Sequence, residues 1–74
     1  MQEKVFSIIN EILAAKELPT VFEFEKEARL REDLGFTSFD LAELTVKIED
    51  EFNIDIFENG LVSTVGEIFI KLNK

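Results

Sequence analysis

The residue of this chain best placed to take part in chemistry is Ser38, which stands where a glycine-containing loop gives way to a helical pattern. The local sequence over residues 33–41 is Asp-Leu-Gly-Phe-Thr-Ser-Phe-Asp-Leu. The start of a helix has a positive dipole end and amides without intrahelical acceptors, so a phosphate on the Ser38 oxygen would be stabilised there. Viewed alone, a serine at a helix start is more often an ordinary residue of the first turn, and both interpretations stay open at this point.

Other reactive groups are scarce. The 74 residues include no cysteine and no histidine, which removes the usual zinc ligands, the cysteine nucleophiles and the commonest general base. Ser38 without a base is a weak nucleophile, and residues 35–39 lack the glycine-flanked nucleophile elbow. A calcium loop beginning at Asp55 would need other residues in place of Phe57 and Gly66. We therefore predict no catalytic residue and no metal site, so that any chemistry at Ser38 requires modification by another enzyme.

The charge of the chain is strongly negative, with sixteen acidic and eight basic residues and a formal net charge of −8. Such a surface repels nucleic acids and anionic lipids and attracts basic protein surfaces, although acids equally keep a small protein soluble. The first residues are polar and acidic, and no stretch approaches the roughly 20 apolar residues of a membrane span. We expect a soluble, cytoplasmic monomer that binds proteins and neither binds nucleic acid nor spans a membrane.

Three segments carry helical periodicity. The first covers about residues 2–16, the second about residues 38–52, and the last begins after Ser63 or Thr64. Their apolar stripes are Val5, Ile8, Ile9, Ile12 and Leu13; Leu41, Leu44, Ile48 and Phe52; and Val65, Ile68, Phe69 and Leu72. No strand pattern of convincing length occurs between them. The sequence predicts one all-α domain over residues 1–74, a small bundle of three to four helices with a long loop between the first and second helices.

Caps and connections complete this prediction. Thr37 with Asp40, and Thr64 with Glu67, are spaced as capping boxes for the second and last helices. The long loop has four apolar residues that we expect to fix it to the core, and its residues 23–31 are compatible with one or two helical turns. These four residues are Phe22, Phe24, Leu30 and Leu34. The second connector has three such anchors and room for a short turn over residues 57–61; its anchors are Ile54, Ile56 and Phe57.

The loop-to-helix sequence of residues 33–40, followed by Leu-Ala-Glu-Leu at 41–44 and Ile-Glu-Asp-Glu-Phe at 48–52, resembles the acyl carrier protein family. That family typically shows a D-L-G-x-D-S-L-D motif, then a glutamate and leucine, then an acidic stretch ending in phenylalanine. The resemblance extends to length, element order and acidity over nearly the whole chain. It implies that Ser38 carries 4′-phosphopantetheine, transferred from coenzyme A by a phosphopantetheinyl transferase, and that the thiol of this arm holds acyl groups as thioesters.

The resemblance also implies a docking surface on the second helix for the transferase and for acyl-processing enzymes with basic surfaces. The expected partner-binding residues are Asp40, Ala42, Glu43, Val46, Glu49 and Asp50. The acids match family positions that meet basic patches or flank the attachment site, and the two apolar residues lie at i, i+4 on the same exposed face. Glu43 is also spaced to pair with Lys47.

Three positions depart from the family pattern. Thr37 stands in place of the usual aspartate, Phe39 in place of the leucine after the serine, and Lys47 interrupts the acidic face. These departures favour a specialised carrier over the housekeeping carrier of fatty acid synthesis. The resemblance predicts a carrier of acyl intermediates for fatty acid or related lipid biosynthesis. The alternatives are a carrier of aminoacyl or polyketide intermediates and an unmodified acidic helical interaction module.

Overall fold

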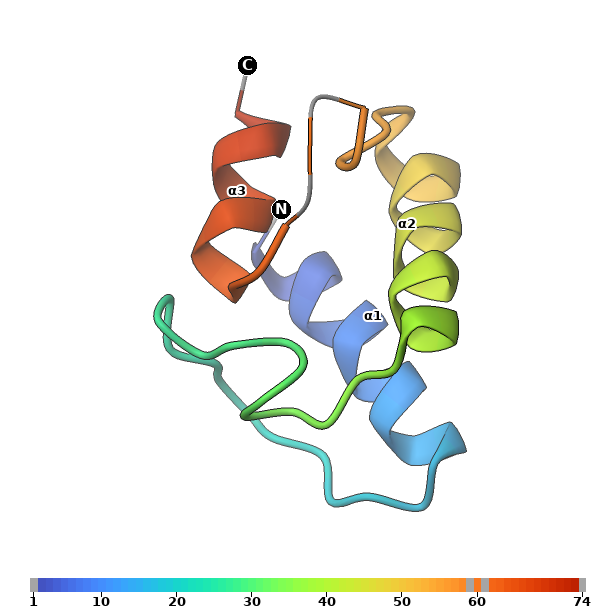
Figure 1. The fold of residues 1–74 in the computed structure, drawn as a ribbon, viewed down its shortest axis with the longest axis vertical. Coiled ribbons are helices and arrows are strands. Elements are labelled where there is room, and N and C mark those ends of the chain that lie inside the picture. The colour runs from blue at the N-terminus through green and yellow to red at the C-terminus, as the bar shows by residue number, and fades with distance from the viewer. Residues whose placement is uncertain (1, 59, 61, 74) are drawn as a thin grey trace.

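Three helices build the part of the chain that the computed structural model describes, which is residues 2–58, 60 and 62–73. They are α1 (Gln2–Ala15), α2 (Ser38–Phe52) and α3 (Val65–Leu72), and the described residues contain no strand. Figure 1 shows the long connection leaving the end of α1, passing around one end of the molecule and returning to the start of α2. The predicted all-α architecture with a long first loop is confirmed. None of the helices in the described residues is long and apolar enough to cross a membrane.

One apolar core joins the helices and both connections. The most deeply buried side chains are Val5, Ile9, Ile12, Leu30, Leu44, Ile48, Ile56, Val65 and Ile68. Phe6 of α1 meets Phe24 of the long connection and Phe69 of α3 in edge-to-face contacts, with ring centroids 5.3 and 6.0 Å apart. Such contacts add to the free energy gained by burying the rings. Phe6 therefore fixes three separate parts of the chain to one another.

The first helix ends in a Schellman-type turn. The amide of Leu18 donates to the carbonyl of Leu13 at 2.9 Å, and the amide of Glu17 donates to that of Ala14 at 3.0 Å. Glu17 adopts a φ of 61°, the left-handed conformation that this turn requires. The helix thus stops one residue earlier than the sequence predicted, and Lys16 lies outside its last turn.

Backbone pairing with the segment before α3 holds the long connection in place. The hydrogen bonds run from the Leu30 amide to Ser63 O (2.8 Å), from the Val65 amide to Ala28 O (3.0 Å) and from the Gly66 amide to Lys26 O (2.9 Å). A Cβ at Gly66 would come within 3.1 Å of the Lys26 backbone, so glycine permits this approach. Residues 23–31 accordingly form turns and an isolated bridge, not the helical turns compatible with their sequence.

Three of the four predicted loop anchors lie in or against the core: Phe24 and Leu30 are buried and Leu34 is partly buried. Phe22 is not an anchor, because its side chain is 97% exposed. The side-chain amide of Asn10 exchanges hydrogen bonds with the backbone of Val21 at 2.7 and 2.9 Å, which holds this stretch at the surface. Phe24, two residues on, takes the core position.

The three predicted anchors of the second connector are confirmed. Asn53, with a φ of 62°, ends α2 and donates its amide to the carbonyl of Glu49 at 2.7 Å. Ile56 is buried, and Ile54 and Phe57 pack against the core. A turn covers residues 56–58; the predicted turn over residues 57–61 includes positions 59 and 61, which lie outside the described residues.

Candidate functional site

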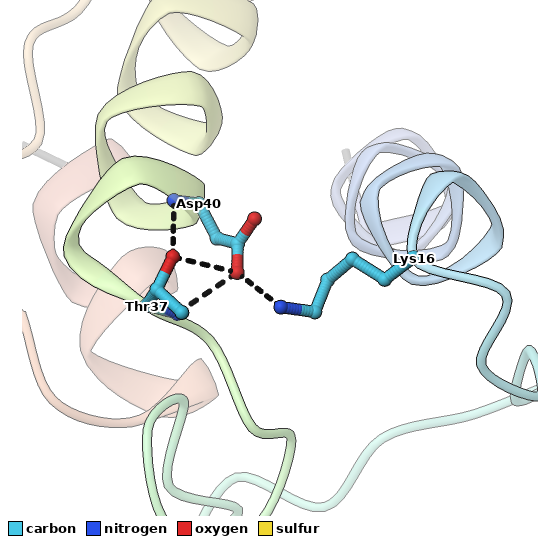
Figure 2. A network of polar contacts seen from close by, with 3 residues as sticks. All are labelled: Lys16, Thr37 and Asp40. Atoms are coloured by element: carbon cyan, nitrogen blue, oxygen red, sulfur yellow. Dashed lines mark hydrogen bonds and ion pairs between the residues drawn. The ribbon is translucent and has the colours of Figure 1, made fainter.

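Ser38 is the first residue of α2, directly after the cap residue Thr37. The Thr37 hydroxyl accepts the amide of Asp40 at 3.2 Å, and the Asp40 carboxylate accepts the amide of Thr37 at 2.8 Å and its hydroxyl at 3.0 Å. Figure 2 shows this reciprocal arrangement, which is the capping box that the sequence predicts. The cap fixes the backbone on both sides of Ser38, whose side chain remains exposed.

Lys16 of the first connection completes this network. Its Nζ lies 2.6 Å from Oδ2 of Asp40, which comes from α2 (Figure 2). The ionic hydrogen bond with Lys16 and, next, the amide of Thr37 lower the pKa of Asp40 against the opposing effect of burial. Asp40 is only 5% exposed. Asp40, which the sequence predicted as a docking residue, is therefore buried and bonded to Thr37 and Lys16. Lys16 compensates its negative charge.

Arg31 supplies a contact to Ser38 that the sequence did not reveal. Its Nη2 donates to Oγ of Ser38 at 2.6 Å, although the two residues are seven positions apart. Gly35, with a φ of 74°, reverses the chain between them, and the amide of Phe36 donates to the carbonyl of Leu30 at 2.9 Å to close the turn. The glycine before a helix start is the sequence signal for such a reversal.

The exposed face of α2 lies opposite its core residues Leu44 and Ile48. At 3.6 residues per turn, its members fall within an arc of about 120°. They are Phe39, Ala42, Glu43, Val46, Glu49 and Asp50, which we call the α2 face. Phe39 and Val46 are 77% and 60% exposed, respectively. The structure thus places five of the six predicted docking residues on one face and adds Phe39 to them. The sequence signal for Phe39 was its spacing of four residues from Glu43, which puts both residues on the same side of a helix.

Ion pairs to α1 occupy the other flank of α2. Lys47 lies 3.4 Å from Glu11, and Lys4 lies 3.0 Å from Glu51. The predicted pair between Glu43 and Lys47 is wrong for this reason: Lys47 reaches across to α1. It consequently leaves the α2 face without a central positive charge.

A hollow of about 210 Å³ lies beside the start of α2. Its walls include Leu41 of α2, one turn after Ser38, together with Leu30 and Arg31 of the long connection and Phe57 and Val62 of the second connector. The remaining walls carry both charges, from Arg29 and Glu32, and Arg31 is the wall residue that also contacts the Ser38 hydroxyl. Among the residues that the structure describes, no group of three or more acidic, histidine or cysteine side chains is arranged to hold a metal ion.

The fold and the site define a class of small acidic carrier domains in which a serine begins the second helix. The family described as "Phosphopantetheine attachment site" matches residues 3–68. The acyl carrier protein of Thermotoga maritima is 33% identical over 75 residues, covering 99% of this chain and 93% of that protein. The acyl carrier protein of Wolinella succinogenes is 34% identical over 74 residues, covering 95% of this chain and 97% of that protein.

A third relative, the acyl carrier protein of Saccharopolyspora erythraea, is 35% identical over 69 residues, which is 90% of this chain and 73% of that protein. No solved structure matches the chain significantly. The chain belongs to the acyl carrier protein family of phosphopantetheine-bearing carrier domains. Its covalent prosthetic group is accordingly 4′-phosphopantetheine, and acyl-processing enzymes are its class of partner.

The residues at the start of α2 fit a phosphodiester. Ser38 offers an exposed hydroxyl, and the guanidinium of Arg31 lies against it. Asp40, two residues further along the chain, is paired with Lys16, which compensates its charge. The first-turn amides of α2 add partial positive charge on the same side.

Proposed function

We propose that this chain is a single carrier domain that bears acyl intermediates as thioesters on a 4′-phosphopantetheine arm bonded to Ser38, for fatty acid or related lipid biosynthesis in the cytoplasm. The observation that carries the assignment to Ser38 is its position: an exposed hydroxyl on the first residue of α2, inside the family match. Among residues 2–58, 60 and 62–73, the one basic side chain hydrogen-bonded to this oxygen is the permanently protonated Arg31, which cannot act as a base. Ser38 thus depends on a transferase for its base.

The modification is a phosphoryl transfer in which the Ser38 oxygen forms a bond to the pantetheine-bearing phosphorus of coenzyme A. The bond to the second phosphate breaks, adenosine 3′,5′-bisphosphate leaves, and a base of the transferase takes the hydroxyl proton. Once attached, the arm supplies the thiol that this cysteine-free chain lacks. The chain itself performs no catalysis in this proposal and acts by tethering, which raises the effective concentration of the acyl group at each partner.

We assign docking to the α2 face, with Phe39 and Val46 as apolar contacts between the acids Glu43, Glu49 and Asp50. All of these residues except the partly buried Glu43 are exposed, and acids around an apolar centre suit a basic partner surface with an apolar depression. Asp40 is assigned to positioning of the α2 start, because its carboxylate is already engaged inside the molecule.

Intact-mass measurement tests the attachment. Incubation with coenzyme A and a broad-specificity phosphopantetheinyl transferase is expected to add one arm to the wild-type chain and none to Ser38→Ala. Ser7→Ala, which removes an exposed hydroxyl from α1, is the matched control and should take the arm as the wild type does. An unmodified wild-type chain, or a Ser38→Ala variant that still gains the arm, contradicts the proposal.

The acyl group on protein isolated from its native cell then decides the cargo. A fatty acyl thioester supports the proposed pathway class, and an aminoacyl or polyketide thioester supports the alternative carrier. A native chain without the arm would mark an unmodified interaction module.

A further inference from the structure

We propose that Arg31 is a positioning residue that binds the phosphate of the arm and holds it at the start of α2. This inference rests on the proposed attachment at Ser38. Its basis is the contact of 2.6 Å between Nη2 of Arg31 and Oγ of Ser38, the atom to which the phosphorus would be bonded. The two non-bridging oxygens of a phosphodiester are bonded to that phosphorus, two bonds from Oγ and within reach of the same guanidinium. Their geometry matches its planar, bidentate fork.

Arg31 is free to take this role, whereas two other cations of the same connection, Arg29 and Lys16, are already paired with acids. Arg29 pairs with Asp33 at 3.3 Å, and Lys16 pairs with Asp40 at 2.6 Å. Arg31 belongs to no ion pair within residues 2–58, 60 and 62–73. It therefore has no carboxylate partner to give up when a phosphate arrives.

The turn that holds Arg31 is fixed before any phosphate binds. Its carbonyl accepts the amide of Gly35 at 3.1 Å, and its neighbour Leu30 is fully buried and bonded to Phe36. The guanidinium consequently begins from a backbone anchored on both sides. Less conformational entropy is lost on binding than for a residue on a loose loop.

The surrounding charge explains why such a cation matters in this chain. With a net charge of −8, the protein repels a further anion, and the phosphodiester adds one. Thr37, adjacent to Ser38, is uncharged and does not compete for the guanidinium. Arg31 therefore supplies local compensation, both when coenzyme A approaches and after the arm is attached.

The test compares the loaded wild-type protein with loaded Arg31→Gln. The matched control is Lys26→Gln, which removes a positive charge from the same connection at an exposed position. In the loaded proteins, the ³¹P resonance of the phosphodiester should shift in Arg31→Gln but not in Lys26→Gln. The shift should shrink as sodium chloride is raised, because salt screens an exposed ionic contact.

Loading kinetics give a second readout. The kcat/KM of the transferase should fall about three- to tenfold for Arg31→Gln, the range expected when an exposed charge-assisted contact is lost. Lys26→Gln should stay near the wild-type value. Circular dichroism melts of the unloaded proteins check that each variant is folded.

The outcomes separate this inference from the proposed function. A wild-type chain that takes no arm refutes attachment at Ser38. Normal loading of all variants with superimposable ³¹P resonances at low salt leaves attachment intact and overturns the role of Arg31. If Arg31→Gln does not fold or does not take the arm, Arg31→Lys is used in its place. This variant keeps the positive charge but loses the two parallel N–H donors of the guanidinium. A ³¹P resonance identical to that of the wild type in this variant would then overturn the inference.

Discussion

Asp40 offers the sharpest test of how the start of α2 is held, through the substitution Asp40→Asn. Its carboxylate is buried and accepts Lys16 at 2.6 Å together with the amide and hydroxyl of Thr37 at 2.8 and 3.0 Å. Asparagine keeps an acceptor for the cap and loses the ionic bond. Hydrogen bonds to charged groups contribute about 1.5–3 kcal/mol. Because Lys16 is itself 26% exposed and regains water in the variant, we expect a loss of about 1.5–2 kcal/mol in the free energy of unfolding.

A loss of this size is large for so small a domain. A chain of this length has a total stability of roughly 4–11 kcal/mol, and each kcal/mol shifts the melting temperature by about 4–8 °C. Thermal unfolding of the unloaded protein at pH 7 should thus place Asp40→Asn about 6–16 °C below the wild type, and urea unfolding should show the same loss of free energy. Asp50→Asn is the control, because it removes an equal charge from an exposed position of the same helix. It should change stability by no more than about 0.5 kcal/mol.

The pH dependence of this difference follows from the pKa of Asp40, which is lower in the folded chain than in the unfolded chain. A carboxyl with a lowered folded pKa stabilises the fold fully above its unfolded pKa of about 3.9 and loses that contribution as the pH falls through the folded value. The gap between wild type and Asp40→Asn should therefore be widest above about pH 5 and close as the pH falls below 4. Equal melting temperatures for Asp40→Asn and Asp50→Asn at pH 7, or a gap that ignores pH, would refute the reasoning.

Two further predictions concern the core and the α2 face. Phe24→Ala should lower the free energy of unfolding in urea by about 3–4 kcal/mol, because it removes a buried ring. Phe22→Ala removes a solvent-exposed ring and should change the same quantity by less than about 0.5 kcal/mol. Similar losses for the two variants would place Phe22 in the core. The double reversal of Glu43 and Asp50 to lysine should slow arm loading and weaken binding to a basic partner more than it lowers the melting temperature, and equal losses would mark these acids as structural.

The sequence alone determined the features that depend on neighbours along the chain. The start of α2 at Ser38 follows from Thr37 and Asp40, which are three residues apart and satisfy each other's backbone. The same local chemistry sets the start of α3, where Glu67 accepts the amides of Ser63 and Thr64 and its pKa is lowered chiefly by the first of these bonds. Helical periodicity and the family motif needed no tertiary information either.

The tertiary structure decided which side chains of the long connection and of the helix surfaces meet. Lys16 and Asp40 form an ion pair although they are 24 residues apart in the sequence. Lys47 pairs with Glu11 of α1 and not with Glu43 of α2, its own helix. Residues 17–37 lack a helical or strand period, so nothing in their sequence showed that Phe22 would face solvent or that Arg31 would reach Ser38. The path of that segment is set by its hydrogen bonds to residues 63–66 and by the ring packing at Phe6, which exist only once the helices have assembled.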